Sequence, residues 1–177
     1  MNMHSGQTMA DEALSWHRFG LVVIPLPPGM KHSAMTWDSW TSDYGPEKIA
    51  QHWAENERDG VGTLMTRQVI VFDADTPEAE EALEAIEKAH GIVCNQVHRT
   101  SKGVHHFYRR TPDVEARNDS CSTDGHPEGI DIKTAAREGI GTGCGAGLVV
   151  LPPGAGRSVE KGVGSTDELV EVGQDFV

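Results

Sequence analysis

The segment that most constrains the fold is VIVFDAD at residues 69–75. Its β-branched and aromatic residues favour a buried strand. Because successive side chains of a strand point to opposite faces, Asp73 and Asp75 are predicted to share one face where the strand leaves the core. A divalent cation would remove the repulsion between these carboxylates, and hard oxygen ligands favour magnesium or manganese. A pair of solvated turn acids, with Asp75 helping to cap the next helix, fits the pattern equally well.

The rest of the chain predicts an α+β (α/β) domain with a mostly antiparallel mixed sheet flanked by helices. Residues 1–10 are expected to form a flexible N-terminus, and residues 11–177 a single catalytic domain. Helices are predicted over residues 10–20, from Pro46 onward and over residues 76–91, and strands over residues 21–26, 66–75, 128–134 and 148–151. Residues 95–110 predict two strands joined by a Ser-Lys-Gly turn, whereas residues 155–177 are weakly patterned.

The third helix has the clearest boundaries. Thr76 is a predicted N-cap, Pro77 occupies the first helical position, acidic residues fill the first turn and Gly91 ends the helix. In the first helix, Ala10, Leu14 and Phe19 are expected to face the core.

The strand EGIDIKT carries a single acid, Asp131, between Ile130 and Ile132. Asp131 is a candidate third metal ligand, and Lys133 on the same face is a candidate phosphate contact. Taken alone, this strand is better explained as an edge strand with a solvent-facing Asp-Lys pair.

The segment RTSKGVHHFYRR places a tight polar turn, Thr100–Gly103, before a strand. Backbone N–H groups of such a turn can hold an anion. Alternation places His105 and Phe107 on one face of the strand and His106 on the other. A histidine just past an anion-binding turn can donate a hydrogen bond to a phosphate, although an ordinary strand histidine is the simpler interpretation of His105 alone.

The order of these motifs resembles the N-terminal domain of bifunctional DNA primase-polymerases, a branch of the archaeo-eukaryotic primase superfamily. Members of this family share the motifs hhDhD, T-x-SGG-x-H-hh-F and hDh, in which h is a hydrophobic residue and x is any residue. A glycine-rich turn and a strand ending in PPS follow these motifs. The corresponding stretches here are VFDAD, RTSKGVHHFYRR, GIDIKT and GIGTGCGAGLVVLPPG. The resemblance covers residues 10–155. This sequence departs from the family pattern at Lys102, which replaces a glycine, and at Gly154, which replaces the serine of PPS.

The resemblance implies a DNA-templated nucleotidyltransferase, a primase or polymerase that joins nucleoside triphosphates with Mg²⁺ or Mn²⁺. It assigns the metal to Asp73, Asp75 and Asp131. It assigns the phosphates of the nucleotide to His105, Ser101, Lys102, Gly103, Lys133 and Lys31. The implied partners are a single-stranded DNA template and a separate replicative helicase, in phage or plasmid replication.

The formal net charge of the 177-residue chain is −12, which opposes DNA binding, since DNA-binding proteins usually present a basic surface. No apolar run approaches the roughly 20 residues that span a bilayer, and the first residues lack a signal-peptide pattern, so a cytoplasmic location without membrane contact is expected. Three cysteines do not indicate a disulfide framework. Cys121 and His126 are close enough in sequence to share a zinc ion, but ordinary thiols are the favoured interpretation.

Two other functions are compatible with the same residues. The acidic charge favours a nucleotide- or DNA-binding accessory module of replication that has kept the fold and lost turnover. The aspartate pair also occurs in other metal-dependent phosphotransferases, nucleases and glycosyltransferases. A small α/β domain with incidental acids is the least specific alternative.

Overall fold

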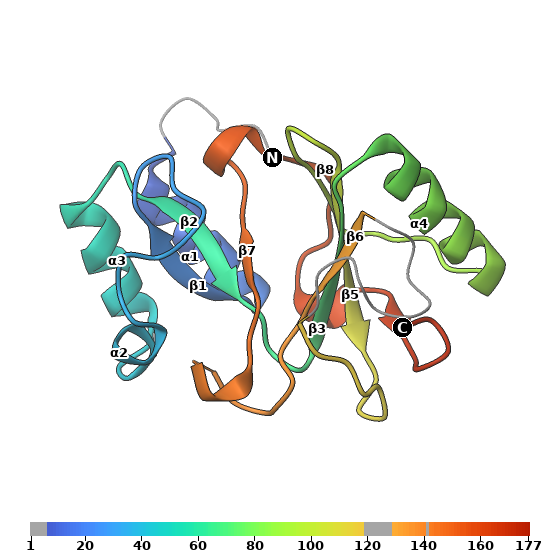
Figure 1. Cartoon of the computed structure of the whole chain (residues 1–177). Helices are drawn as coiled ribbons and strands as arrows, with labels where there is room; N and C mark the ends of the chain where they lie inside the picture. Colours follow the sequence, from blue (N-terminus) through green and yellow to red (C-terminus); the bar gives the residue numbers. More distant parts are fainter. Residues whose placement is uncertain (1–6, 119–128, 141) are drawn as a thin grey trace.

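The structure, a computed structural model, describes residues 7–118, 129–140 and 142–177. Two β-sheets face each other across the molecule, and helices cover the outer side of each (Figure 1). Nearly all strand pairs are antiparallel, which confirms the predicted α+β class. The strands divide between two sheets, however, and do not form the single sheet that the sequence suggested.

The first sheet has the strand order β1-β2-β7 and carries the helices α1, α2 and α3. The side chain of Thr8 accepts a hydrogen bond from the Asp11 N–H, and Asp11 accepts one from the Thr8 N–H. This capping box starts the first helix one residue before the predicted position. The elements are α1 (Met9–Phe19), β1 (Val22–Leu26), α2 (Trp37–Thr41), α3 (Pro46–Glu55), β2 (Gly60–Leu64) and β7 (Leu148–Val150).

The second sheet has the order β6-β3-β5-β4-β8, and β9 adds to it as a parallel neighbour of β5. Helix α4 packs on the face of this sheet that points away from the first sheet (Figure 1). Its cap residues Thr76 and Gly91 are those predicted. The elements are β3 (Val69–Ala74), α4 (Pro77–His90), β4 (Val97–Arg99), β5 (Val104–Arg110), β6 (Ile130–Lys133), β8 (Ser158–Lys161) and β9 (Glu171–Val172). Short 3₁₀ turns occupy Thr142–Cys144, Gly154–Gly156 and Thr166–Glu168.

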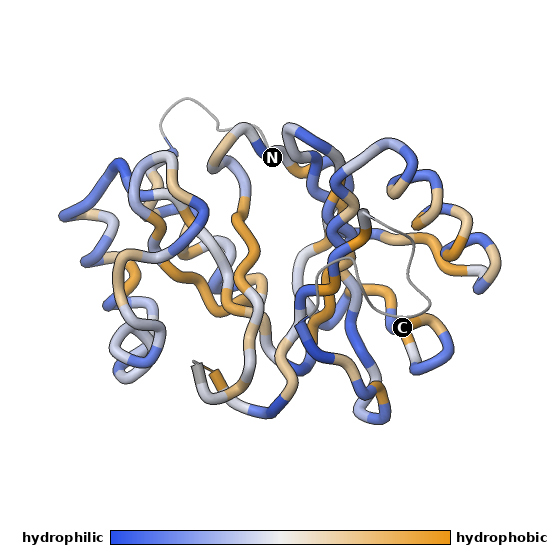
Figure 2. Tube along the Cα trace, viewed as in Figure 1, coloured by the Kyte–Doolittle hydropathy of each residue, from blue (hydrophilic) through white to orange (hydrophobic). Residues whose placement is uncertain are grey.

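The side chains of β3 divide between two hydrophobic cores. Val69 and Val71 belong to the hydrophobic core that also contains residues of the first sheet, α1 and α3. Ile70 and Phe72 belong to the core beneath α4. Figure 2 shows hydrophobic residues along the strands and hydrophilic residues on the turns and outer helix surfaces. Because Asp73 continues the alternation of Val69 and Val71, its carboxylate lies on the face directed toward the first sheet.

Several elements were not evident in the sequence. Strand β2 has a glycine-rich sequence of low strand propensity. Gly62 occupies a tight position there, because an added Cβ would lie 3.1 Å from Leu26 and from Leu148. Strand β8 is an edge strand with half-exposed or exposed side chains and therefore shows no apolar run. In α1, Ala13, Trp16 and Phe19 are the buried apolar residues, whereas the predicted Ala10 and Leu14 are only partly buried.

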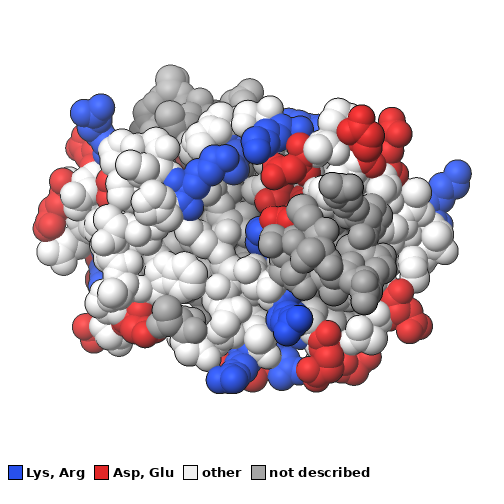
Figure 3. All heavy atoms as spheres, in the orientation of Figure 1, with Lys and Arg blue, Asp and Glu red and all other residues white. Residues whose placement is uncertain are grey.

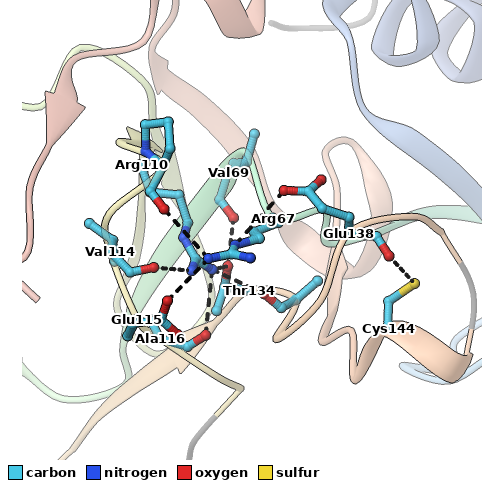
Figure 4. A network of polar contacts seen from close by, with 11 residues as sticks. Arg67, Val69, Arg110, Val114, Glu115, Ala116, Thr134, Glu138 and Cys144 are labelled. Atoms are coloured by element: carbon cyan, nitrogen blue, oxygen red, sulfur yellow. Dashed lines mark hydrogen bonds and ion pairs between the residues drawn. The ribbon is translucent and has the colours of Figure 1, made fainter.

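A buried arginine, Arg110, joins the chain segments at the start of β3 and after the end of β6 (Figure 4). The guanidinium of Arg110 donates to Val114 O at 2.5 Å, to Ala135 O at 3.0 Å and to Thr134 Oγ1 at 2.8 Å. Thr134 in turn donates to Val69 O on β3 at 3.0 Å. Arg110 therefore fixes the segment that follows β6, the strand of Asp131, against β3, the strand of Asp73.

Candidate active site

The predicted acidic and histidine residues form a row across the second sheet. Asp73 on β3 is paired directly with His105 on β5 on one side and with Asp131 on β6 on the other. His98 on β4 extends the row, since it is paired with His105. Side chains directly opposite each other on antiparallel strands point to the same face. The row therefore lies on the face directed toward the first sheet.

Each of the two carboxylates in this row contacts a basic side chain. His105 Nε2 lies 3.2 Å from Asp73 Oδ1, and Lys133 Nζ lies 2.6 Å from Asp131 Oδ2. The imidazole of His105 is only 4% exposed and the side chain of Asp73 18% exposed, so the first pair is shielded from solvent. Burial alone raises the pKa of Asp73. The adjacent His105 and the charges of Lys133 and Arg157 outweigh burial, so this pKa lies below its ordinary value. Asp73 is consequently ionised at neutral pH.

A cleft opens between this row and the first sheet. Asp73, Asp75 and His105 contribute its acidic and imidazole groups. Three cationic side chains, Lys31, Lys102 and Arg157, also border it. The remaining lining residues are Thr100, Ser101, Leu148, Val149 and Val150. Of the other predicted site residues, Asp131 is the neighbour of Asp73 in the row, Lys133 contacts Asp131, and Gly103 is the last residue of the turn.

The turn before β5 differs from its expected role. The N–H groups of Lys102 and Gly103 both donate to Thr100 Oγ1, at 3.1 and 3.0 Å. These two donors are therefore used inside the turn. The sequence had suggested that they would point toward an anion. Gly103 has a steric role instead, because an added Cβ would lie 1.9 Å from Ala74 O. Its lack of a side chain lets the turn with Ser101 and Lys102 pack against the end of β3.

Arg157 borders the cleft and was not predicted from the sequence. It precedes β8, in the segment that shows no clear periodicity. Burial lowers the pKa of its guanidinium, although the carboxylates of Asp73 and Asp75 act in the opposite direction. Arg157 Nε is buried without a hydrogen-bond partner among the described residues. The only sequence signal was a basic residue shortly after Pro-Pro. The backbone there is held in place by the hydrogen bond from Trp16 Nε1 to Pro152 O at 2.9 Å.

The donor groups of the row are suited to a hard divalent cation. Asp73 Oδ1 is buried and has no hydrogen bond within the described part of the chain, although His105 Nε2 lies 3.2 Å away. A buried carboxylate oxygen without a donor is costly unless a cation or another donor meets it. Asp75 borders the same cleft, and Asp131 is the cross-strand neighbour of Asp73. Carboxylate oxygens favour Mg²⁺ or Mn²⁺.

Residues 13–164 match the family described as bifunctional DNA primase/polymerase, N-terminal. This chain belongs to the Prim-Pol family. The match covers both sheets except β9, includes His98, His105, Asp73 and Asp131, and confirms the family resemblance of the motifs. A search of curated proteins finds no significant match to the sequence. Among the described residues, no helix is long and apolar enough to cross a membrane.

The charge distribution of this Prim-Pol domain is uneven. Figure 3 shows lysine and arginine side chains gathered along the upper part of the face between the two sheets, beside a group of acidic side chains. The net charge of −12 is therefore compatible with a local cationic surface at the cleft. Cys121 and His126, the pair considered for zinc, lie outside the described residues.

Proposed function

We propose that this chain is a DNA-templated nucleotidyltransferase that joins nucleoside triphosphates on a single-stranded template. The observation that carries the proposal is the cross-strand row of His105, Asp73 and Asp131 facing a cleft with cationic side chains. Phosphoryl transfer requires charge neutralisation and alignment of the attacking and leaving oxygens more than covalent catalysis. A cleft that combines carboxylates on one wall with cations around it supplies both requirements.

The carboxylates of Asp73, Asp75 and Asp131 would hold the divalent cations. Such cations lower the pKa of the attacking 3′-hydroxyl and offset charge on the triphosphate and leaving group. Within the protein, Lys133 limits the repulsion between Asp131 and Asp73 through its 2.6 Å contact with Asp131. Asp73 and Asp131 are paired on β3 and β6, so the sheet fixes their separation, and Asp75 directly follows β3.

The triphosphate would bind on the cationic side of the cleft. Lys31, Lys102 and Arg157 offset its negative charge, and the hydroxyl of Ser101 donates a hydrogen bond to it. We assign His105 a hydrogen bond from Nε2 to a phosphate oxygen, in place of its present contact with Asp73. His105 is almost fully buried, which limits the orientations that its ring can adopt.

Primer synthesis and extension on single-stranded DNA, in Mn²⁺ or Mg²⁺ buffer, test the proposal. Asp73→Asn and Asp75→Asn should each lower the rate at least about 100-fold, because each removes a carboxylate that would hold the cations. Asp175→Asn, an exposed acid far from the row in sequence, is the matched control and should retain the wild-type rate. Wild-type activity in the double variant Asp73→Asn/Asp75→Asn would disprove the assignment.

The acidic net charge supports a second candidate, an accessory module that binds nucleotide or DNA without turnover. Nucleotide binding measured in the same buffer separates the two functions. Binding of triphosphates without any extension product would favour the accessory module. Nicked DNA, or transfer from a sugar nucleotide, would instead indicate a nuclease or a glycosyltransferase.

A further inference from the structure

A second cluster of ligand-type side chains lies on the opposite face of β5, beneath α4. It consists of Glu87 in the last turn of α4, Cys94 in the segment after this helix and His106 on β5. One ligand atom from each residue lies within 4.8 Å of the other two. The three residues are 9%, 1% and 6% exposed, respectively. The alternation of β5 that directs His105 toward the cleft directs His106 into this cluster.

The contacts within the cluster are short and convergent. His106 Nδ1 lies 2.6 Å from Glu87 Oε1, and the Tyr108 hydroxyl donates to the same carboxylate oxygen. Cys94 Sγ is directed at two backbone carbonyls, Gln96 O at 3.3 Å and Phe107 O at 3.5 Å. These are weak partners for a thiol, and no disulfide involves Cys94. The cluster therefore brings a sulfur, a nitrogen and a carboxylate oxygen to one point inside the core.

The electrostatics of the cluster favour a dication. A thiolate, a carboxylate and a neutral imidazole together carry two negative charges, which one dication cancels. A neutral assembly avoids the high cost of burying net charge.

We propose that Glu87, Cys94 and His106 bind a zinc ion, with the hydroxyl of Tyr108 or a water molecule as the fourth ligand. Thiolate and imidazole ligands select zinc over magnesium or manganese, and three protein ligands with a fourth position fit tetrahedral zinc. Zinc binds the thiolate form of Cys94 and a ring nitrogen of His106 that carries no proton, so binding weakens as the pH falls. The site is separate from the carboxylate row, which lies on the other face of the sheet and has only oxygen ligands.

The consequence of zinc at this position is structural. Glu87 belongs to α4 and His106 to β5, so the ion would join the helix to the strand that positions His105. A ligand that binds only the folded state raises its stability. We therefore expect zinc to raise the thermal midpoint of the chain by several degrees and to leave the nucleotide chemistry on the other face unchanged.

Metal binding by the full chain tests this site directly. Purified protein is treated with a chelator, dialysed and titrated with Zn²⁺, and in parallel with Co²⁺, whose bond to a thiolate gives a charge-transfer absorption band. The wild-type chain should bind about one zinc ion tightly and show the cobalt–thiolate band. Cys94→Ala should lose the band and the thermal shift. Glu87→Gln, which retains the side-chain size and a hydrogen-bonding group, should weaken zinc binding at least about tenfold.

Three control variants show whether the band comes from Cys94. Cys144→Ala removes the other described buried free thiol, and Cys121→Ala removes the remaining cysteine of the sequence; both should keep the band. Asp73→Asn/Asp75→Asn should also keep it, because zinc does not use the carboxylate row. The proposal is overturned if wild-type protein gives no cobalt–thiolate band, or if Cys94→Ala retains it. Loss of the band in Cys121→Ala, with retention in Cys94→Ala, would likewise overturn it.

Discussion

Asp73 on β3 and Asp131 on β6 are direct cross-strand partners, so two carboxylates share one face of the second sheet. Like charges placed opposite each other destabilise a sheet unless a cation intervenes. The ammonium of Lys133 contacts Asp131, but Asp73 Oδ1 is left without a hydrogen bond among the described residues. This relationship explains why the row can hold cations and why its acids are not interchangeable with other surface acids.

The pair leads to a prediction for Asp131. Asp131→Asn should lower primer extension at least about 100-fold, because it removes one of three carboxylates that hold the cations. The free energy of unfolding without divalent ions should change by no more than about 1 kcal/mol. The asparagine side chain has nearly the same volume as aspartate, and it removes the repulsion between the carboxylates of Asp73 and Asp131. Thermal unfolding with and without Mn²⁺ checks this, because Mn²⁺ should stabilise the wild type more than the variant. Equal stabilisation of both would remove Asp131 from the metal site.

Gly103 offers a test of the turn that carries Ser101 and Lys102. Gly103→Ala should destabilise the fold by about 1–3 kcal/mol, because the new Cβ would lie 1.9 Å from Ala74 O and the backbone must move. The same displacement moves the turn from the cleft and should reduce extension activity. Gly143→Ala is the matched control, since no atom lies within 4 Å of its added Cβ. Urea unfolding of the two variants should differ clearly, and equal midpoints would show that the turn tolerates the side chain.

Arg157 is predicted to bind the triphosphate. Arg157→Gln should raise the KM for nucleoside triphosphates about tenfold, as expected from the loss of a charge-assisted contact, with a smaller effect on kcat. Arg137→Gln, at an exposed position, should leave both constants unchanged. Steady-state extension at varied triphosphate concentration gives both values. A fall in kcat at constant KM would assign Arg157 to another step.

Arg110 should be among the most sensitive core positions of the second sheet. Arg110→Met retains the apolar contacts of the side chain but leaves Val114 O and Ala135 O without their donor. The expected loss is about 3 kcal/mol, the cost of several unsatisfied buried groups. Arg110→Lys should recover only part of it, because an ammonium cannot reproduce the planar arrangement of donors. Chemical denaturation measures both, and full recovery by lysine would show that charge alone matters.

Glu12 is a buried carboxyl in the first turn of α1, and burial raises its pKa above the ordinary value of 4.5. A raised folded-state pKa means that Glu12 favours folding most below pH 4.5 and that this contribution is lost as the pH rises through the folded pKa. Glu12→Gln should therefore raise the thermal midpoint at pH 7 by about 1–3 °C. Glu84→Gln, at an exposed position of α4, is the control.

The pH dependence gives this prediction its direction. The advantage of Glu12→Gln should shrink below pH 4.5, where the wild-type carboxyl is protonated in both states. Thermal unfolding of the three proteins across this pH range is the measurement. A midpoint difference that stays constant with pH would show that packing, and not ionisation, distinguishes glutamine from glutamate.

Local pattern determined the faces of individual elements. Alternation along residues 69–75 and 104–110 predicted the face of its strand on which each side chain lies. In the structure Asp73 and His105 share one face of the sheet and His106 lies on the other. Thr76 and Gly91 marked the ends of α4 correctly. These features depend on neighbouring residues and on backbone geometry, so a few consecutive residues suffice to specify them.

Only the tertiary structure decided which strands meet. Nothing local indicates that β3 lies between β5 and β6, which is what places Asp131 beside Asp73, or that Arg157 reaches the same cleft. The division into two sheets and the meeting of Glu87, Cys94 and His106 have the same origin. Each possible strand pairing gains long-range contacts but is opposed by loop-closure entropy. Which pairing forms depends on how well whole faces of the sheets pack. The sequence by itself therefore specified side-chain direction and element boundaries, whereas packing between distant segments assembled the sites.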